Sequence, residues 1–101
     1  MAIKRFADQG TSDIYHGLNT KDARRIPQNV WKAAQRKLSA LHTATSTQDL
    51  SLPGLRIEPL KYDRPGFYSI CVNDIYRIIF RFEAGDAYEV SIESFHGRKQ
   101  S

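Results

Sequence analysis

Residues 67–96 alternate apolar and polar side chains in three successive segments, and this period of two constrains the fold more than any other feature of the chain. The segments are 67–72, 76–82 and 87–96. Strict alternation is typical of strands with one buried face. The intervening residues 73–75 and 84–86 contain Asn, Asp and Gly, which favour turns. We therefore expect a three-stranded antiparallel meander with one buried face.

The register of this meander follows from the same alternation. A one-residue slip would turn every apolar side chain to the wrong face, so both hairpins require an odd loop, at 73–75 and at 84–86. The expected cross-strand neighbours are Val72 with Tyr76, Cys71 with Arg77, Phe82 with Tyr88, Arg81 with Glu89 and Arg77 with Glu93. The inward side chains of the last strand are then Tyr88, Val90 and Ile92. The two Arg–Glu neighbours predict charge pairs on the solvent face.

The first half of the chain has the period of a helix. The apolar positions of residues 27–44 that share one helical face are Trp31, Ala34, Leu38 and Leu41. Residues 7–20 predict a short helix capped by Asp8 and stopped by Gly17, and Gly10 weakens it. Residues 20–27 predict a helical turn, and residues 43–54 a polar loop.

Two further short segments predict strands. Residues 2–6 alternate briefly, and residues 56–61 contain Pro59, which argues for an edge position or a bulge. Helices must cover one face of the sheet, because neither layer buries its apolar side alone. We expect a two-layer α+β fold, with an N-terminal strand and two helices packed on an antiparallel sheet of about four to five strands. Residues 1–96 would form one domain, followed by a basic tail, 97–101.

Composition narrows the possible functions without choosing one. Apolar runs are too short to span a membrane, and the start of the chain has no signal-peptide core, so a cytoplasmic location is expected. Cys71 is the single cysteine, and no cluster of Asp, Glu, His and Cys has metal-ligand spacing, so no cofactor or metal is expected. The net charge of +4 fits a solvated surface, an RNA-binding surface or an acidic protein partner equally well.

Histidines and cations are the candidates for chemistry. His16 and His42 fall near predicted helix ends, where a dipole or solvent contact is the common role. His96 continues the last strand as its core pattern ends, where a titrating imidazole is useful. Lys61 could be an edge lysine that blocks strand pairing, and Arg77 could serve only Glu93. Together, lysine, arginine and histidine suit metal-free RNA cleavage, which needs a base, an acid and cations around the phosphate.

The order of motifs resembles that of HigB-type toxins of the RelE/ParE superfamily. The resemblance runs from about residue 2 to residue 96, and its most specific part is "LKYDRPGFYSICVNDIYRIIFRF". It implies a bacterial type II toxin that cuts messenger RNA in the ribosome. It also implies a helix-turn-helix antitoxin of the HigA type and a complex that binds operator DNA through that antitoxin.

The resemblance also assigns roles to residues. By position it makes Lys61, Arg77 and His96 the catalytic set. The candidate RNA contacts are Arg64, Asn73, Tyr76 and Phe95, the last as a stacking surface.

This chain departs from the family pattern at several of these positions. The closing motif, usually Asp-Tyr-His, is Ser94-Phe95-His96, Cys71 and Asn73 occupy a stretch where many members carry an arginine, and Tyr62 replaces a common glycine.

These departures leave alternatives open. One is a weakened or inactive toxin that acts mainly by binding its antitoxin in operon autoregulation. Others are a basic RNA-binding domain and the superfamily branch that poisons DNA gyrase, from which the "LK…YRI…H" pattern points away.

Overall fold

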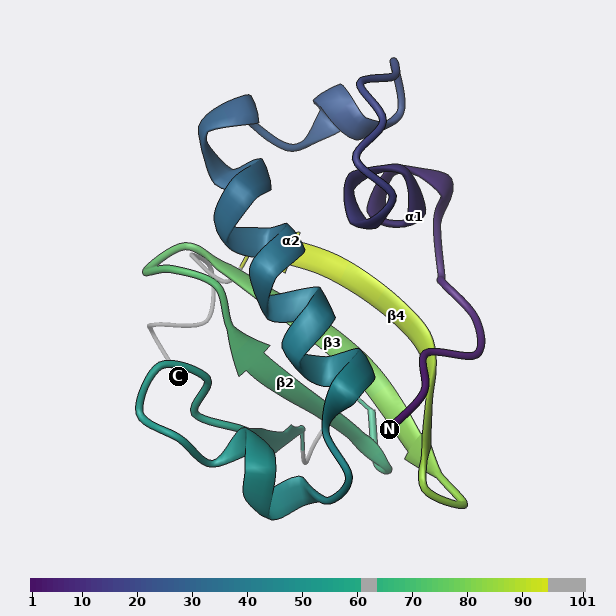
Figure 1. The fold of residues 1–101 in the computed structure, drawn as a ribbon, viewed down its shortest axis with the longest axis vertical. Helices are drawn as coiled ribbons and strands as arrows, with labels where there is room; N and C mark the ends of the chain where they lie inside the picture. Colours follow the sequence, from purple (N-terminus) through teal and green to yellow (C-terminus); the bar gives the residue numbers. More distant parts are fainter. Residues whose placement is uncertain (61–63, 95–101) are drawn as a thin grey trace.

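The alternating half of the chain builds a four-stranded antiparallel sheet in the order β1-β2-β3-β4 (Figure 1). The strands are β1 (Glu58–Leu60), β2 (Phe67–Cys71), β3 (Tyr76–Glu83) and β4 (Asp86–Ser94). This computed structural model describes residues 1–60 and 64–94. β1 is an edge strand, as Pro59 predicted, since a residue without an N–H is tolerated there. The expected tail 97–101 lies outside the described residues.

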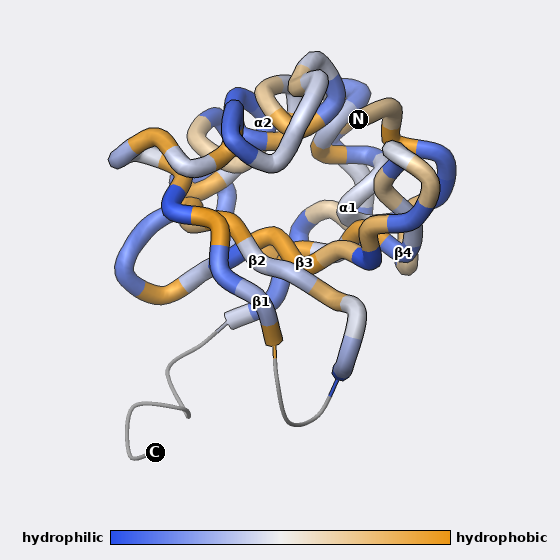
Figure 2. The backbone as a smooth tube through the Cα atoms, turned by 90° about the horizontal axis from the view of Figure 1, so that it is seen from below, coloured by the Kyte–Doolittle hydropathy of each residue, from blue (hydrophilic) through white to orange (hydrophobic). Residues whose placement is uncertain are grey.

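Helices cover one face of this sheet and give the two-layer α+β fold that the sequence predicted (Figures 1 and 2). They are α1 (Gln9–Tyr15) and α2 (Gln28–Thr43), with short 3₁₀ turns at η1 (Ala23–Arg25) and η2 (Thr47–Leu50). η1 falls in the segment predicted to add a helical turn. η2 was not expected, because the segment is mostly polar and was predicted to be a loop. Its one apolar residue, Leu50, is fully buried.

The core lies between α2 and the sheet. Ala34, Leu38 and Leu41 are fully buried, as the helical period predicted, and Trp31 packs at the edge with its Nε1 donating to Ile26 O at 2.8 Å. The sheet side of the core is formed by Ile70, Ile78, Phe80, Val90 and Ile92. No helix in the described ranges is long and apolar enough to cross a membrane.

α1 begins and ends where its capping residues predicted. The Asp8 carboxylate accepts the Thr11 N–H at 2.7 Å, and Gly17 adopts a φ of 77° just beyond the helix. Helix propensity predicts only that Gly10 weakens the helix, but the structure shows why a glycine is present at this position. A Cβ at this position would stand 2.5 Å from the Asp22 carbonyl oxygen, so glycine permits the close approach of α1 to the start of η1.

The N-terminal strand is reduced to two isolated bridges. Ile3 and Phe6 lie parallel to Ala87 and Val90 of β4, with Lys4 N donating to Ala87 O at 2.8 Å. The segment therefore borders β4 and covers part of its outer edge, without forming a continuous strand.

The first hairpin has the predicted register, and the second does not. Cys71 faces Arg77, and Val72 N donates to Tyr76 O across the loop 73–75. In the second hairpin, Glu83 pairs with Asp86, so the loop is only Ala84-Gly85, both with positive φ as a type I′ turn requires. A register shift follows between Ile79 and Arg81 on β3, and opposite it Glu89 has a φ of 52°.

The extra residue thus sits in a β-bulge on β4 instead of in the loop. Before the bulge, Ala87 faces Phe82, and Tyr88 faces Arg81. Placing Tyr88 in the core and opposite Phe82 was wrong. Beyond the bulge the predicted parity returns, with Val90 and Ile92 buried.

The expected Arg81–Glu89 pair was wrong for the same reason. Arg81 forms an ion pair with Glu83 on its own strand and lies 4.9 Å from the centre of the Tyr88 ring. Glu89 instead pairs with Arg5 of the N-terminal segment.

Candidate active site

Arg77 lies on the face of the sheet that the helices leave uncovered, and it is held in place by β2. Its Nε donates to Ser69 Oγ at 2.8 Å, and its Nη2 donates to Arg56 O at 3.1 Å and to Ser69 O at 3.4 Å. Only 11% of the side chain is exposed. Glu58 of β1 provides a carboxylate 3.8 Å away. The guanidinium is therefore fixed in one orientation and keeps its charge, since arginine does not deprotonate in proteins.

Two features of the backbone place these partners. Arg56 has a left-handed φ of 49°, uncommon for a non-glycine residue, and its N–H bonds to Leu52 O at 2.9 Å. This turn directs the Arg56 carbonyl toward Arg77. Glu58 pairs with Ser69 in the β1–β2 register, so both lie on the Arg77 face. Sequence reasoning missed all three partners: Ser69 lies within the quoted motif but was given no role, and Arg56 and Glu58 lie outside it.

The surface of the sheet beside Arg77 is shielded from solvent. Ser69, Ile79 and Ser91 form one row across β2, β3 and β4, and each is at most 5% exposed. The burial of Ile79 was not expected, because alternation with one buried face predicts that Ile79, on the same face as Arg77, is exposed to solvent. An electrostatic interaction is stronger where water is excluded than in bulk solvent, so this row increases the effect of a cation at its edge.

Arg64 makes the ion pair that was expected of Arg77. Its two terminal nitrogens reach the two Glu93 carboxylate oxygens at 3.0 and 3.1 Å, a fork geometry that suits arginine. Arg77 and Glu93 are register neighbours as predicted, but the described ion partner of Arg77 is Glu58. The expected Arg77–Glu93 charge pair was therefore wrong.

Glu93 is stabilised in its charged form. Burial raises the pKa of this carboxyl, but hydrogen bonds from Arg64 and from Ser91 Oγ, the latter at 2.6 Å, outweigh burial and leave the pKa below its usual range. The Arg64 charge is thereby largely balanced by a neighbour on β4.

Two of the predicted RNA contacts have structural roles. Asn73 Oδ1 accepts the N–H groups of Ile75 and Tyr76 at 2.8 and 2.7 Å and closes the β2–β3 turn. Tyr76 packs against the core on the helix side of the sheet, so the fold does not bring it to the Arg77 face. An RNA contact by either residue stays a prediction.

Lys61, Phe95 and His96 lie outside the described residues, and so does Tyr62. The last described residues before these segments, Leu60 and Ser94, lie at opposite ends of the sheet along the direction of β3. Leu60 pairs with Phe67, which faces Arg81 near the end of β3, whereas Ser94 pairs with Tyr76 at its start. Arg77 is thus the one member of the expected catalytic set whose surroundings can be described.

The other two histidines lie at helix ends as predicted, but only His16 contacts its own helix end, whereas His42 contacts the N-terminal segment. His16 Nδ1 is 2.8 Å from Ser12 O at the end of α1, and His42 Nδ1 accepts the Ile3 N–H at 3.2 Å at the end of α2. Within residues 1–60 and 64–94, no group of three or more His, Cys, Asp or Glu side chains is arranged to hold a metal ion.

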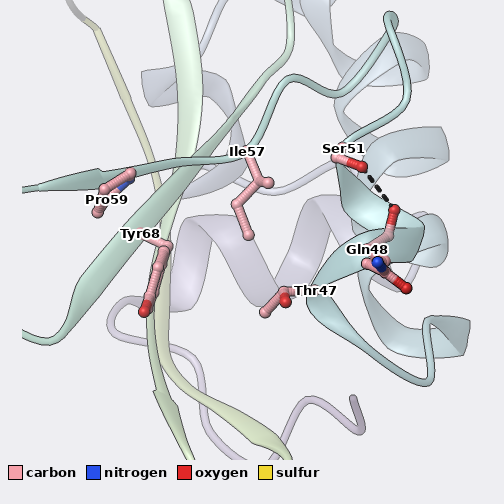
Figure 3. A pocket seen from close by; sticks show the side chains of 6 residues that line it. All are labelled: Thr47, Gln48, Ser51, Ile57, Pro59 and Tyr68. Atoms are coloured by element: carbon pink, nitrogen blue, oxygen red, sulfur yellow. Dashed lines mark hydrogen bonds between the residues drawn. The ribbon is translucent and has the colours of Figure 1, made fainter.

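A small pocket opens between η2 and the edge of the sheet (Figure 3). Ile57, Pro59 and Tyr68 give it an apolar side, and residues of η2 and its flank give it a polar rim, where Ser51 Oγ donates to Gln48 O at 2.8 Å. Tyr68 packs toward the core, so the pocket lies on the helix side of β1 and not on the Arg77 face.

Comparison with known proteins settles the family. The model of the RelE-like toxin of the type II toxin–antitoxin system HigB matches residues 4–95. The chain belongs to the HigB-like toxin family. It is 33% identical to Endoribonuclease HigB of Proteus vulgaris over 99 residues, covering 93% of this chain and 99% of that protein. It is 35% identical to Toxin HigB-1 of Vibrio cholerae over 94 residues, covering 92% and 96%.

Solved structures support the same fold at lower identity. The YoeB dimer of Staphylococcus aureus has a TM-score of 0.58 at 16% identity, over 95% of this chain and 97% of that one. The YoeB/ParE toxin of Agrobacterium tumefaciens has a TM-score of 0.52 at 20% identity, over 95% and 99%. Membership of the HigB-like family confirms the predicted family, and an antitoxin partner follows from the type II class.

Proposed function

We propose that this HigB-like toxin is an endoribonuclease that cleaves messenger RNA on the ribosome, with Arg77 as the cation that stabilises the transition state. Two findings support the proposal: a relative of similar length named as an endoribonuclease, and the anchored guanidinium of Arg77 on an otherwise uncovered sheet face. The second observation carries it. A charge held before the substrate arrives needs no reorganisation during reaction, which is the condition for electrostatic catalysis.

The reaction that suits these residues is attack of the RNA on its own backbone. A base removes the proton of the 2′-hydroxyl, its oxygen attacks the adjacent phosphorus, and the bond to the 5′-oxygen breaks. An acid then protonates that oxygen, leaving a 2′,3′-cyclic phosphate and a free 5′-hydroxyl. Arg77 would bind the phosphate oxygens as negative charge accumulates on them. The resemblance assigns Lys61 to the electrostatic set and His96 to proton transfer, without need of a metal.

Arg64 has a different part in this proposal. Its fork to Glu93 directs its donors at a carboxylate and ties Arg64 to β4, and the RNA contact predicted for Arg64 stays a prediction. The base-stacking role of Phe95 and the RNA contacts of Asn73 and Tyr76 belong to the proposal as well. We place the toxin in the cytoplasm, with a HigA-type helix-turn-helix antitoxin through which the complex reaches operator DNA.

Induced expression tests the proposal. Wild-type toxin should arrest growth and produce new 5′ ends in translated messages by primer extension. The Arg77→Ala variant should do neither, while Arg81→Ala should behave as wild type. Arg81 is the matched control because it is an arginine on the same face of the same strand and pairs with Glu83. Continued growth and uncut messages with the wild-type toxin would refute the activity.

A second candidate is a weakened toxin whose main action is to bind its antitoxin. The observation that favours it is Ser94, an exposed residue at the end of β4 where the family motif has a carboxylate. Restoring the motif with Ser94→Asp and Phe95→Tyr should then convert a harmless chain into a toxic one. A fully toxic wild type would exclude this second candidate.

A further inference from the structure

A run of positive charge without acidic residues extends from η1 through α2, between Asp22 and Asp49. Residues 23–48 contain five arginines and lysines and no Asp or Glu, while the whole chain has a net charge of +4. The remaining residues therefore carry one net negative charge. α2 lies across the helix side of the sheet, opposite the face that holds Arg77 (Figure 2).

Three of these five cations have partners within the fold. Arg24 donates to Asn19 Oδ1 at 2.9 Å, and Arg25 pairs with Asp8 at 2.9 Å. Lys37 donates to the carbonyl oxygens of Gly54 and Cys71 at 2.8 and 3.2 Å, where it ties α2 to the end of β2. These contacts explain the three residues as structural.

Lys32 and Arg36 are not explained in this way. Both are exposed on the outer side of α2, and neither has a hydrogen bond or ion pair with any residue in the described ranges. They stand four positions apart, one helical turn, so two like charges are neighbours with no acid to offset them. Such a pair disfavours the helix, which makes it a cost to the fold unless something else compensates.

The surface around these two cations is polar. Lys32, Gln35, Arg36 and Ser39 line a shallow hollow on α2. Gln35 is held by its contact with Tyr15 O at 3.4 Å, and Ser39 is exposed. We name this surface, formed by those four lining residues, the α2 basic surface. Cations combined with amide and hydroxyl side chains are the usual contacts to phosphate and sugar.

A protein partner fits this surface less well. Protein interfaces depend on apolar or aromatic anchors near their centre, and none of the four lining residues is apolar. The large apolar side chains that are exposed in the described residues, Leu18, Leu52 and Ile75, lie elsewhere. The charge and polarity of the surface complement a phosphate backbone.

We propose that the α2 basic surface binds the phosphodiester backbone of RNA, independently of cleavage at the Arg77 face. Nucleic-acid strands carry about one charge per 3.4 Å of axis, so neighbouring phosphates can meet both Lys32 and Arg36. Binding there would offset the like-charge repulsion on α2. The toxin would then hold RNA by two separate surfaces, one that anchors and one that cuts.

The test is equilibrium binding of a fluorescent RNA that is 2′-O-methylated throughout and so has no hydroxyl for cleavage. The wild type, the double variant Lys32→Gln/Arg36→Gln, the single variant Lys32→Gln and its matched control Lys4→Gln are compared over a range of salt. Lys4 is an exposed lysine without a partner in the described ranges, so it loses the same charge at a different place. Circular dichroism confirms that each variant is folded.

Each phosphate contact contributes about 0.7 to the salt slope for single-stranded RNA, so the double variant should lower the slope by roughly 1.4. At 0.1 M salt this corresponds to roughly 25-fold weaker binding if affinities agree at 1 M salt. Lys32→Gln should lower the slope, and Lys4→Gln should not. Single-stranded and duplex forms of the same sequence identify which RNA is bound, and loss of affinity with either form supports the proposal.

A double variant that binds both RNA forms like the wild type would overturn the proposal. If that variant also fails to bind the antitoxin, the surface belongs to a protein partner. Because the RNA cannot be cut, Arg77→Ala toxin should give the same dependence on Lys32 and Arg36, so a failure of the cleavage proposal would not affect this result.

Discussion

Ser69 is the side chain through which the fold fixes Arg77, so removal of its hydroxyl tests whether that anchoring matters. Ser69 is fully buried and its Oγ accepts from Arg77 Nε at 2.8 Å. Ser69→Ala removes this acceptor and leaves the bonds from Arg77 to the carbonyls of Arg56 and Ser69 in place. The substitution also creates only a small cavity, because it deletes one oxygen atom.

The size of the effect follows from the kind of bond. A hydrogen bond to a charged group contributes about 1.5–3 kcal/mol. If that energy holds the guanidinium in its transition-state geometry, its loss slows cleavage by roughly 10- to 150-fold. The fall should appear in kcat more than in KM, because Ser69 positions a catalytic group and does not touch the RNA.

Ser91→Ala is the matched control. Ser91 is the same residue type in the same buried row, but its hydroxyl donates to Glu93 and not to Arg77. Both variants should lose stability in urea unfolding, and only Ser69→Ala should lose cleavage in single-turnover assays on programmed ribosomes. Equal cleavage rates for the two variants would refute the claim that Ser69 positions Arg77.

Three further predictions concern the fold that carries the site. Gly10→Ala should lower the free energy of unfolding by about 1–2 kcal/mol, because a clash with the Asp22 carbonyl outweighs the gain in helix propensity; an unchanged urea midpoint would contradict this. Ala84→Asn should raise it by about 0.5–1 kcal/mol, since Asn tolerates the positive φ of the turn; a lower melting temperature would contradict this. The pKa of Glu93 is lowered in the fold, so its contribution to stability is present above the ordinary value of 4.5 and is lost as pH falls through the folded pKa. Unfolding of wild type and Glu93→Gln between acid and neutral pH should show a weaker pH dependence in the variant.

Alternation predicted the layers and most of the register, and its error in the second hairpin has a physical cause. For both Phe82 and Val90 to face the core, the connection between them must contain one residue more than a regular hairpin with a two-residue turn. The alternation does not show where that extra residue lies. A two-residue turn at Ala84-Gly85 followed by a bulge at Glu89 satisfies the parity as well as a three-residue loop does. Sequence alternation cannot distinguish the two, because only the residues between turn and bulge, such as Tyr88, change face.

Charge pairing could be predicted only in part. Register correctly placed Arg77 beside Glu93, but long side chains choose among several carboxylates within reach. Arg64 approaches Glu93 from a loop, and Arg77 turns toward Ser69 and Glu58 on the other side. Such choices depend on loop positions that no local pattern encodes.

The central claim is that the Arg77 guanidinium stabilises the transition state of RNA cleavage. The most direct test is the single-turnover rate of messenger RNA cleavage on programmed ribosomes by wild type, Arg77→Ala and Arg81→Ala, with ribosome binding measured in parallel. Loss of one positioned electrostatic donor costs about 10²–10³ in rate, so Arg77→Ala should slow cleavage by that factor while binding is kept and Arg81→Ala stays near wild type. Cleavage by Arg77→Ala at the wild-type rate would contradict the account.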